Sequence, residues 1–234
     1  MIQPDTVIVL QARMASQRLP GKAMERLAGD TLVGHCLRRL TSAGLAPVVL
    51  ATTVALEDDV LAAEALRYGV RVIRGPREDV LRRFAQVARE TGAAYLIRAT
   101  ADNPAVDIDG PARVLAAIRA GRADYCCERS LPHGAAVEAV RAEALLDAAA
   151  HAVEPYDREH VTPYVKFNRL RYRVLMPEAP AAVRRPDLRV TVDTPADLDY
   201  VHQVLEAAGR GTGPAPLADI IRAADALGDR ARVA

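Results

Sequence analysis

The 234-residue sequence contains no tryptophan, two phenylalanines and three cysteines. Three cysteines, two of them adjacent at Cys126 and Cys127, form neither a disulfide framework nor the spacing of a zinc site, so we expect reduced, structural thiols. No apolar run approaches the roughly 18 residues that a membrane span requires, and no charged segment followed by an apolar stretch opens the chain. We therefore expect a soluble, cytoplasmic protein with no membrane partner.

An excess of charge of one sign is also missing. The 31 lysines and arginines nearly balance the 30 aspartates and glutamates, which gives a net charge of +1. This balance argues against a global basic field for nucleic acid and against disorder driven by acidic excess, so no nucleic-acid partner is expected. Half of the residues are apolar, and the length is sufficient for a sizeable core.

Lysine is scarce, because Lys22 and Lys166 are the only lysines among the 31 basic residues. A lysine is a compact point charge, whereas an arginine is a planar fork, so the two are not equivalent in a binding site. Lys22 follows Arg13 and Arg18 closely in the chain. Either a point charge is required at this position or chance placed the lysine there.

Strand-like and helix-like segments alternate in the first half of the chain, which predicts an α/β fold with a mainly parallel sheet and helices on both faces. We expect strands at 6–11, 47–52, 70–73 and 94–98, and helices at 31–41, 57–68, 78–91 and 111–120. The second half is less regular. We expect strands there at 123–127, 138–140, 172–176 and 188–192, and helices at 141–151, 157–167, 196–208 and 217–226.

The first expected strand runs into a cationic loop (residues 11–22) that holds Arg13, Arg18 and Lys22 and turns at Pro20-Gly21. Ligands of an open parallel sheet bind outside the carboxyl ends of its strands, and cations there favour an anion. The loop lacks the Gly-Lys-Ser/Thr of a Walker A motif. We expect its side-chain charges, helped by backbone N–H groups, to hold a nucleoside triphosphate; an exposed basic loop is the alternative.

Two acids, Asp102 and Asp193, each lie just past an expected buried strand. Two carboxylates from distant strands suit Mg²⁺, which commonly completes its shell with phosphate oxygens and water. Each acid also has a structural interpretation. Asp193 precedes Pro195 and could be the N-cap of the next helix, and Asp102 could initiate a turn.

Residues 11–22 resemble the opening motif of cytidylyltransferases of the nucleotide-diphosphosugar transferase (GT-A) fold. The subgroup that it resembles most is that of spore-coat polysaccharide biosynthesis, and the acylneuraminate and 3-deoxy-manno-octulosonate cytidylyltransferases are related. Further matches follow in order along nearly the whole chain, at 51–53, 74–75, 79–81, 98–104, Asp107, Gly134, Glu138, 158–163 and 192–198.

The resemblance implies a Rossmann-like GT-A fold in one nucleotidyltransferase domain, residues 1–234. Residues 1–122 would form the nucleotide-binding half, and 123–234 a smaller, irregular half that binds the acceptor and completes the metal site. Relatives are commonly homodimers, so a homodimer is expected, with the two final helices or residues 129–140 as candidate faces.

The resemblance also implies roles for individual residues. Arg13, Lys22 and Asp102 would be catalytic, and Asp102 and Asp193 would bind Mg²⁺. The nucleotide-binding positions are Gln11, Ala12, Arg13, Arg18, Lys22, Thr52, Thr53, Arg74 and Asp79. The acceptor-binding positions are Glu138, Arg158 and His160, with His160 a candidate general base.

The expected reaction is Mg²⁺-dependent transfer of a nucleotidyl group from a nucleoside triphosphate to a sugar phosphate or a sugar acid, with release of pyrophosphate. The resemblance favours CTP and a place in activated-sugar or polysaccharide biosynthesis. The chain departs from its relatives in three places. Ala15 and Ala101 stand where the family usually has glycine, and Ala136 stands where the nearest relatives usually have aspartate.

Three alternatives remain open at this point. The enzyme could use GTP or another triphosphate. It could instead be a glycosyltransferase that uses a nucleotide sugar, with Asp107-Ile108-Asp109 as its metal motif, although a diphosphate needs fewer cations than the loop holds. It could also be a regulatory module that binds a nucleotide without turnover.

Overall fold

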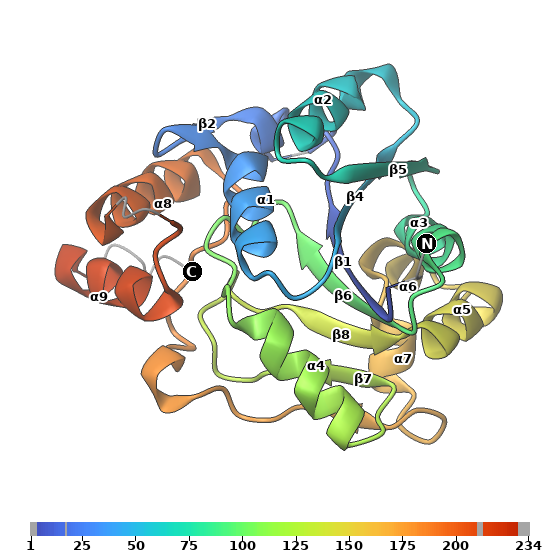
Figure 1. The fold of residues 1–234 in the computed structure, drawn as a ribbon. Helices are drawn as coiled ribbons and strands as arrows, with labels where there is room; N and C mark the ends of the chain where they lie inside the picture. Colours follow the sequence, from blue (N-terminus) through green and yellow to red (C-terminus); the bar gives the residue numbers. More distant parts are fainter. Residues whose placement is uncertain (1–3, 17, 210–212, 229–234) are drawn as a thin grey trace.

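The computed structural model describes residues 4–16, 18–209 and 213–228 (Figure 1). A seven-stranded sheet forms its centre, with the strand order β5-β4-β1-β6-β8-β7-β9. The strands are β1 (Thr6–Gln11), β4 (Val48–Thr53), β5 (Arg71–Gly75), β6 (Tyr95–Thr100), β7 (Tyr125–Cys127), β8 (Glu138–Arg141) and β9 (Val174–Leu175). Strands β5, β4, β1 and β6 are parallel, whereas β8 is antiparallel to both β6 and β7. The predicted α/β fold with a mainly parallel sheet is therefore confirmed.

Strand β1 shows why the sheet is covered on both faces. Val7 and Val9 point into one apolar cluster and Ile8 and Leu10 into another, and all four are fully buried. Alternate residues of a strand point to opposite faces, so an uninterrupted apolar strand needs helices on both sides. Helices α1 (Leu32–Ser42), α2 (Asp59–Arg67) and α4 (Gly110–Ala120) cover the face of Ile8 and Leu10, and α3 (Val80–Thr91), α5 (Ala142–His151) and α7 (Pro163–Phe167) cover the face of Val7 and Val9.

A third apolar cluster lies to one side of the sheet, where α8 (Pro195–Ala208) and α9 (Leu217–Leu227) pack together (Figure 1). It also takes residues from a hairpin of β2 (Arg26–Leu27) and β3 (Asp30–Thr31), which the sequence analysis did not predict. The shorter elements are η1 (Lys22–Met24), η2 (Leu56–Asp58), α6 (Pro155–His160) and η3 (Ala181–Val183). In the described part of the chain, no helix combines the length and apolarity needed to cross a membrane.

The strand predicted at 188–192 is wrong. Within the described residues, this segment forms an isolated bridge between Arg189 and His133 and joins no strand of the sheet. Val190 and Val192 are fully buried in the third cluster, which accounts for the strand-like apolar alternation. The backbone N–H of Val192 donates to Asp102 O (2.8 Å), so the segment pairs with the chain that follows β6.

The helix predicted at 157–167 is also wrong as a single element. Helix α6 ends at His160 and α7 begins at Pro163. Proline lacks a backbone N–H and disfavours helical geometry at the residue before it, so Pro163 separates the two helices. Val161, between them, has φ 75° and ψ −55°, which is a strained conformation for a β-branched residue.

Gly134 has φ 98°, and a Cβ at this position would lie 2.7 Å from the backbone nitrogen of Thr191. We expect Gly134→Ala to lower the free energy of unfolding by about 2–4 kcal/mol, because backbone strain adds to the clash. Gly69→Ala is the matched control, since Gly69 has φ 66° but open space around it, and about 1 kcal/mol is expected. Urea unfolding measures both variants. An equal loss of unfolding free energy in Gly134→Ala and Gly69→Ala would show that the backbone of Thr191 leaves room for a Cβ at position 134.

Candidate active site

The cationic loop begins between two neighbouring strands. The N–H of Ala12 donates to Ala51 O (3.3 Å), at the end of β4, and the N–H of Ala101, just past β6, donates to Gln11 O (3.0 Å). These bonds fix the start of the loop at the carboxyl ends of β1, β4 and β6, which is the edge where an open parallel sheet binds ligands.

The loop then folds back on itself. Met14 O accepts from the N–H groups of Ser16 (2.9 Å) and Gly21 (3.0 Å). Gly21 has φ 75°, a left-handed conformation in which glycine is unstrained. It turns the chain into η1, which begins at Lys22. The turn predicted at Pro20-Gly21 is therefore present, and it determines where Lys22 lies.

A buried carboxylate that the sequence analysis missed, that of Asp58, holds this loop. Oδ1 accepts from the N–H of Met14 (2.7 Å), and Oδ2 accepts from both the N–H (3.2 Å) and the hydroxyl of Thr53. Asp58 is 1% exposed. In the sequence it looks like one of three acids at a helix start, at Glu57-Asp58-Asp59, so no local signal distinguishes it.

A cavity of about 500 Å³ opens at this edge of the sheet. Most of the residues predicted for the site line it, and they come from both halves of the chain. They are Gln11, Ala12, Arg13, Arg18, Lys22, Asp102, His160 and Asp193. The structure therefore brings the loop cations and the two acids together at one cavity.

Lys22 lies between the two acids. Its Nζ donates to Val192 O (2.7 Å) and to Asp193 Oδ1 (3.0 Å), and it is 3.6 Å from Asp102 Oδ2. The side chain is 14% exposed. A compact ammonium can meet three acceptors in this space, whereas a planar guanidinium has a larger, fixed geometry.

Asp193 is surrounded by cations and does not cap the following helix. Besides Lys22, Arg18 Nη2 is 2.8 Å from Oδ1 and Arg189 Nη2 is 2.6 Å from Oδ2. Burial alone would raise the pKa of Asp193, but these cations lower it below its ordinary value. Thr194 is the N-cap of α8 and forms a capping box with Asp197, so the N-cap interpretation of Asp193 is wrong.

Asp102 has one carboxylate oxygen, Oδ1, that is buried without a hydrogen-bond partner in the described structure. Its backbone oxygen accepts from Val192 N, which brings the chain at Asp193 alongside it. An orphaned carboxylate oxygen beside a second carboxylate is a donor set that Mg²⁺ fits, with phosphate and water as further ligands. Among the described residues, no group of three or more His, Cys, Asp or Glu could hold a metal without such ligands.

Arg13 and His160 lie where α6 meets the cationic loop. Arg13 pairs with Glu159 (3.3 Å) and, at 3.8 Å, with Glu78. His160 is exposed, and its ring contacts that of Tyr156 with centroids 4.4 Å apart and the ring planes tilted by 48°. The imidazole is therefore accessible to a ligand.

Arg83, which the sequence analysis missed, also lines the cavity. It is 2% exposed, and its Nη1 donates to the backbone oxygens of Pro76 (2.7 Å) and Arg77 (3.0 Å). Burial and the neighbouring Arg13 lower the pKa of Arg83 to about 10. A buried arginine in an amphipathic helix is not separable by pattern from the exposed ones, so no sequence signal marks it.

Six of the predicted residues do not line the cavity: Thr52, Thr53, Arg74, Asp79, Glu138 and Arg158. Thr52 and Thr53 are buried, and Thr53 binds Asp58. Arg74 pairs with Asp59 (2.7 Å). Asp79 caps α3 and pairs with Arg158 (3.3 Å), so a residue predicted for the nucleotide and one predicted for the acceptor contact each other.

The Asp-X-Asp alternative does not fit the structure. Asp107 is 1% exposed and its Oδ2 accepts from Arg113 Nη2 (2.7 Å), while Asp109 lies on the surface. Neither residue lines the cavity, so the motif is not available as the metal site of a glycosyltransferase. The alanines at 15 and 101 cause no backbone strain, because neither has a positive φ.

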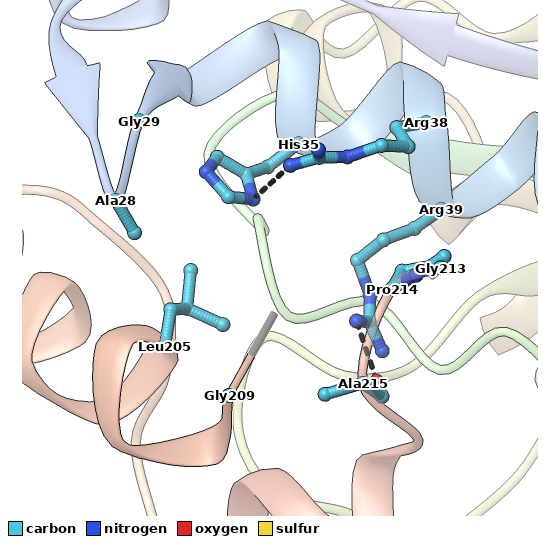
Figure 2. A pocket seen from close by; sticks show the side chains of 10 residues that line it. All are labelled: Ala28, Gly29, His35, Arg38, Arg39, Leu205, Gly209, Gly213, Pro214 and Ala215. Carbon is cyan, nitrogen blue, oxygen red and sulfur yellow. Dashed lines mark hydrogen bonds between the residues drawn. The ribbon is translucent and has the colours of Figure 1, made fainter. Parts of the chain in front are cut away.

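A second cavity, of about 190 Å³, lies between α1 and the chain that enters α9 (Figure 2). Arg39 crosses from α1 and donates to Val106 O (2.6 Å) and Ala215 O (2.8 Å), as the dashed line to Ala215 shows. His35 and Arg38 line the same cavity and contact each other. No residue predicted for the site lines it, and Arg39 acts there as a structural link.

The sequence profile of the cytidylyltransferase family matches residues 7–212. The chain belongs to this family. It is 34% identical over 211 residues to the spore coat polysaccharide biosynthesis protein SpsF of Bacillus subtilis (strain 168), covering 88% of each chain. It is 34% identical over 113 residues to the 3-deoxy-manno-octulosonate cytidylyltransferase of Solibacter usitatus, covering 47% of this chain and 42% of that one.

A solved cytidylyltransferase structure from Leptospira borgpetersenii has a TM-score of 0.88 and 25% identity to this chain, covering 95% of it and 94% of that chain. The nucleotidyltransferase fold and the family expected from the resemblance are thus confirmed. This cytidylyltransferase is accordingly an enzyme of CTP-using nucleotidyl transfer.

Asp58 allows a test of how the cationic loop is held. We expect Asp58→Asn to destabilise the cytidylyltransferase by about 2 kcal/mol, because an amide cannot accept from Met14 and Thr53 together, and to raise the KM for CTP about tenfold. Glu57→Gln is the matched control, since Glu57 is exposed and its carboxylate lies 3.4 Å from Arg77 Nη1, away from the cationic loop. Chemical unfolding and steady-state kinetics measure the two effects, and an unchanged KM would contradict the assigned role.

Proposed function

We propose that this cytidylyltransferase requires Mg²⁺ and transfers CMP from CTP to a sugar phosphate or a sugar acid, with release of pyrophosphate, in the biosynthesis of an activated sugar for a polysaccharide. The observation that carries the proposal is the convergence of Arg13, Arg18 and Lys22 with Asp102 and Asp193 at one cavity. Three cations offset most of the negative charge of a triphosphate, and the two carboxylates suit a divalent ion.

In this reaction an acceptor oxygen attacks the α-phosphorus of CTP. A new oxygen–phosphorus bond forms, the bond to the bridging oxygen of the β-phosphate breaks, and pyrophosphate leaves with that electron pair. Catalysis of such transfer rests on positioning and on charge neutralisation. Arg13 and Lys22 neutralise the phosphates and the leaving group, and Arg18 contributes from the rim of the cavity. Mg²⁺, held by Asp102 and Asp193, would supply further charge neutralisation at the phosphates.

In the structure, Arg18 and Lys22 both contact Asp193. A triphosphate and its metal ion would exchange these contacts, since the carboxylate then meets Mg²⁺ and the two cations meet phosphate. This exchange leaves none of the charged groups unpaired, which a partly buried site requires.

The acceptor determines whether a base is needed. A sugar phosphate is already ionised near neutral pH, whereas the hydroxyl of a sugar acid must lose a proton. His160, exposed at the cavity, is the residue that we propose for this role. Ala136 is half-buried against the third apolar cluster and contributes no hydrogen-bonding side chain where the nearest relatives usually have aspartate.

A homodimer remains a prediction, and the structure suggests other faces for it than the two final helices and residues 129–140. Helices α8 and α9 and residues such as Leu131 and Ala135 are packed into the third cluster. Among the described residues, the large apolar side chains with the greatest exposure lie elsewhere. They are Val54, Leu56 and Leu66 near α2, and Val153, Phe167 and Leu170 near α6 and α7.

The proposed reaction is tested by pyrophosphate release, with each common ribonucleoside triphosphate crossed against sugar phosphates and sugar acids in the presence of Mg²⁺. We expect CTP to be preferred, and Asp102→Asn or Asp193→Asn to lower kcat/KM at least about 100-fold. Asp109→Asn is the control, because Asp109 lies outside the cavity. Full turnover by the Asp102→Asn, Asp193→Asn double variant would refute the metal assignment. Binding of a nucleotide without turnover would favour a regulatory module.

Lys22→Arg tests whether a point charge is required. We expect kcat to fall about tenfold or more, because a guanidinium cannot take the place of the ammonium between the two acids. Lys166→Arg is the control on the only other lysine, whose Nζ lies over the rings of Tyr125 and Phe167. An unchanged kcat in Lys22→Arg would mean that chance placed the lysine.

A further inference from the structure

Arg98 is a cation of the cavity that takes no part in the proposed reaction. Arg98 lies on β6 and lines the cavity, with its side chain 15% exposed. Its guanidinium is held on two sides: Nε donates to Gln11 Oε1 (3.1 Å) and Nη1 donates to Glu138 Oε2 (2.6 Å). Nη2 has no acceptor among the described residues. Arg98 is therefore a rigidly held cation with a free donor.

Glu138 lies directly opposite Arg98 in the antiparallel register of β6 and β8. Its Oε1 accepts from the Tyr125 hydroxyl (2.6 Å), and its Oε2 accepts from Arg98 and from the Thr162 hydroxyl (3.0 Å). Glu138 does not line the cavity. Both of its oxygens are occupied by protein donors, so it would have to break these bonds in order to bind an acceptor.

The charge of Glu138 is maintained by the same neighbours. Burial by itself would raise the pKa of Glu138, but Arg98 and the hydroxyls of Tyr125 and Thr162 bring it below the ordinary value. A carboxylate that remains ionised holds a guanidinium with a charge-assisted hydrogen bond, the strongest kind available to side chains. Glu138 thus fixes the direction of Arg98.

The network also reaches α6. Thr162 N donates to His160 O (2.9 Å) across Val161, which makes a γ-turn with positive φ, the rare and strained form. Strain of this kind persists only where the surroundings hold it, and the Thr162–Glu138 bond is one such restraint. Arg98 and the cavity-lining end of α6, with Glu159 and His160, are therefore parts of one hydrogen-bonded unit.

We propose that Arg98 binds the oxyanion of the acceptor and that Glu138 is a positioning residue that acts through Arg98. This inference rests on the proposed function and makes the acceptor an anionic sugar. The remaining cations on the cavity are either in the cationic loop or, like Arg83, bound to backbone oxygens, whereas Arg98 has a free Nη2. In a sugar phosphate, the oxyanion held by Arg98 is itself the nucleophile. In a sugar acid, it is the carboxylate that orients the attacking hydroxyl.

The test compares Arg98→Gln, Arg98→Lys and Glu138→Gln with Arg71→Gln. Arg71 is the matched control, because it also bonds a glutamate at 2.6 Å from a strand, but on the surface, with Glu90. We expect Arg98→Gln to raise the KM for the acceptor roughly 10- to 100-fold, with the dissociation constant of CTP changed less than about twofold. Glu138→Gln raises the same KM less, and Arg98→Lys retains part of the binding.

Two further measurements make the outcomes decisive. If Glu138 acts through Arg98, the double variant Arg98→Gln, Glu138→Gln has the same acceptor KM as Arg98→Gln alone. Additive effects of the two substitutions on the acceptor KM would overturn the positioning role. Calorimetry with a non-hydrolysable CTP analogue measures binding of a sugar phosphate, a sugar acid and a neutral sugar. Equal binding of the neutral sugar, or a loss of CTP affinity in Arg98→Gln in place of acceptor affinity, would overturn the inference.

The two proposals can fail separately. An anionic sugar that binds through Arg98 without pyrophosphate release would refute the proposed function and leave the inference standing. Turnover that is insensitive to Arg98→Gln at low acceptor concentration would leave the proposed function and refute the inference. Preference for a sugar phosphate over a sugar acid, or the reverse, identifies which oxyanion Arg98 accepts.

Discussion

The ammonium group of Lys22 joins parts of the chain that are 170 residues apart. It donates to Val192 O and Asp193 and lies beside Asp102, so it ties the cationic loop, the chain after β6 and the start of α8 to one point. A partly buried charge is tolerable only when its partners are in place, and the same holds for the two acids. The site therefore exists only when the sheet and the third apolar cluster have both formed.

The sequence alone predicts the features of this arrangement that depend on a local residue pattern or on a general rule of parallel sheets. The apolar run from Val7 to Leu10 predicts a strand that is buried on both faces, and the structure confirms it. The rule that ligands lie at the carboxyl ends of parallel strands predicts that Arg13, Lys22 and Asp102 lie together, and in the structure they line one cavity. Asp193 was placed there through a strand that does not exist; the segment before it reaches the site by bonding to Asp102 O.

The residues that the sequence could not reveal act through partners far along the chain. Asp58 resembles any acid at a helix start, and only its bond to Met14, 44 positions away, shows that it holds the loop. Arg98 lies within a recognised motif, but its role depends on the register that places Glu138 opposite it. Glu138 was expected to contact the acceptor, and the structure instead surrounds it with protein donors.

Asp58 and Glu138 show how the cavity is organised, since each is a buried carboxylate that fixes one wall. Asp58 fixes the cationic loop, and Glu138 fixes Arg98 and, through Thr162, the end of α6. A buried carboxylate is stable only with all its donors in place, so each network has essentially one geometry. The networks share no residue, and a substitution in one leaves the bonds of the other intact. The bonds of Asp58 to the cationic loop therefore do not depend on the bonds of Glu138 to Arg98, and the two walls meet where Arg98 Nε donates to Gln11 Oε1, at the first residue of the loop.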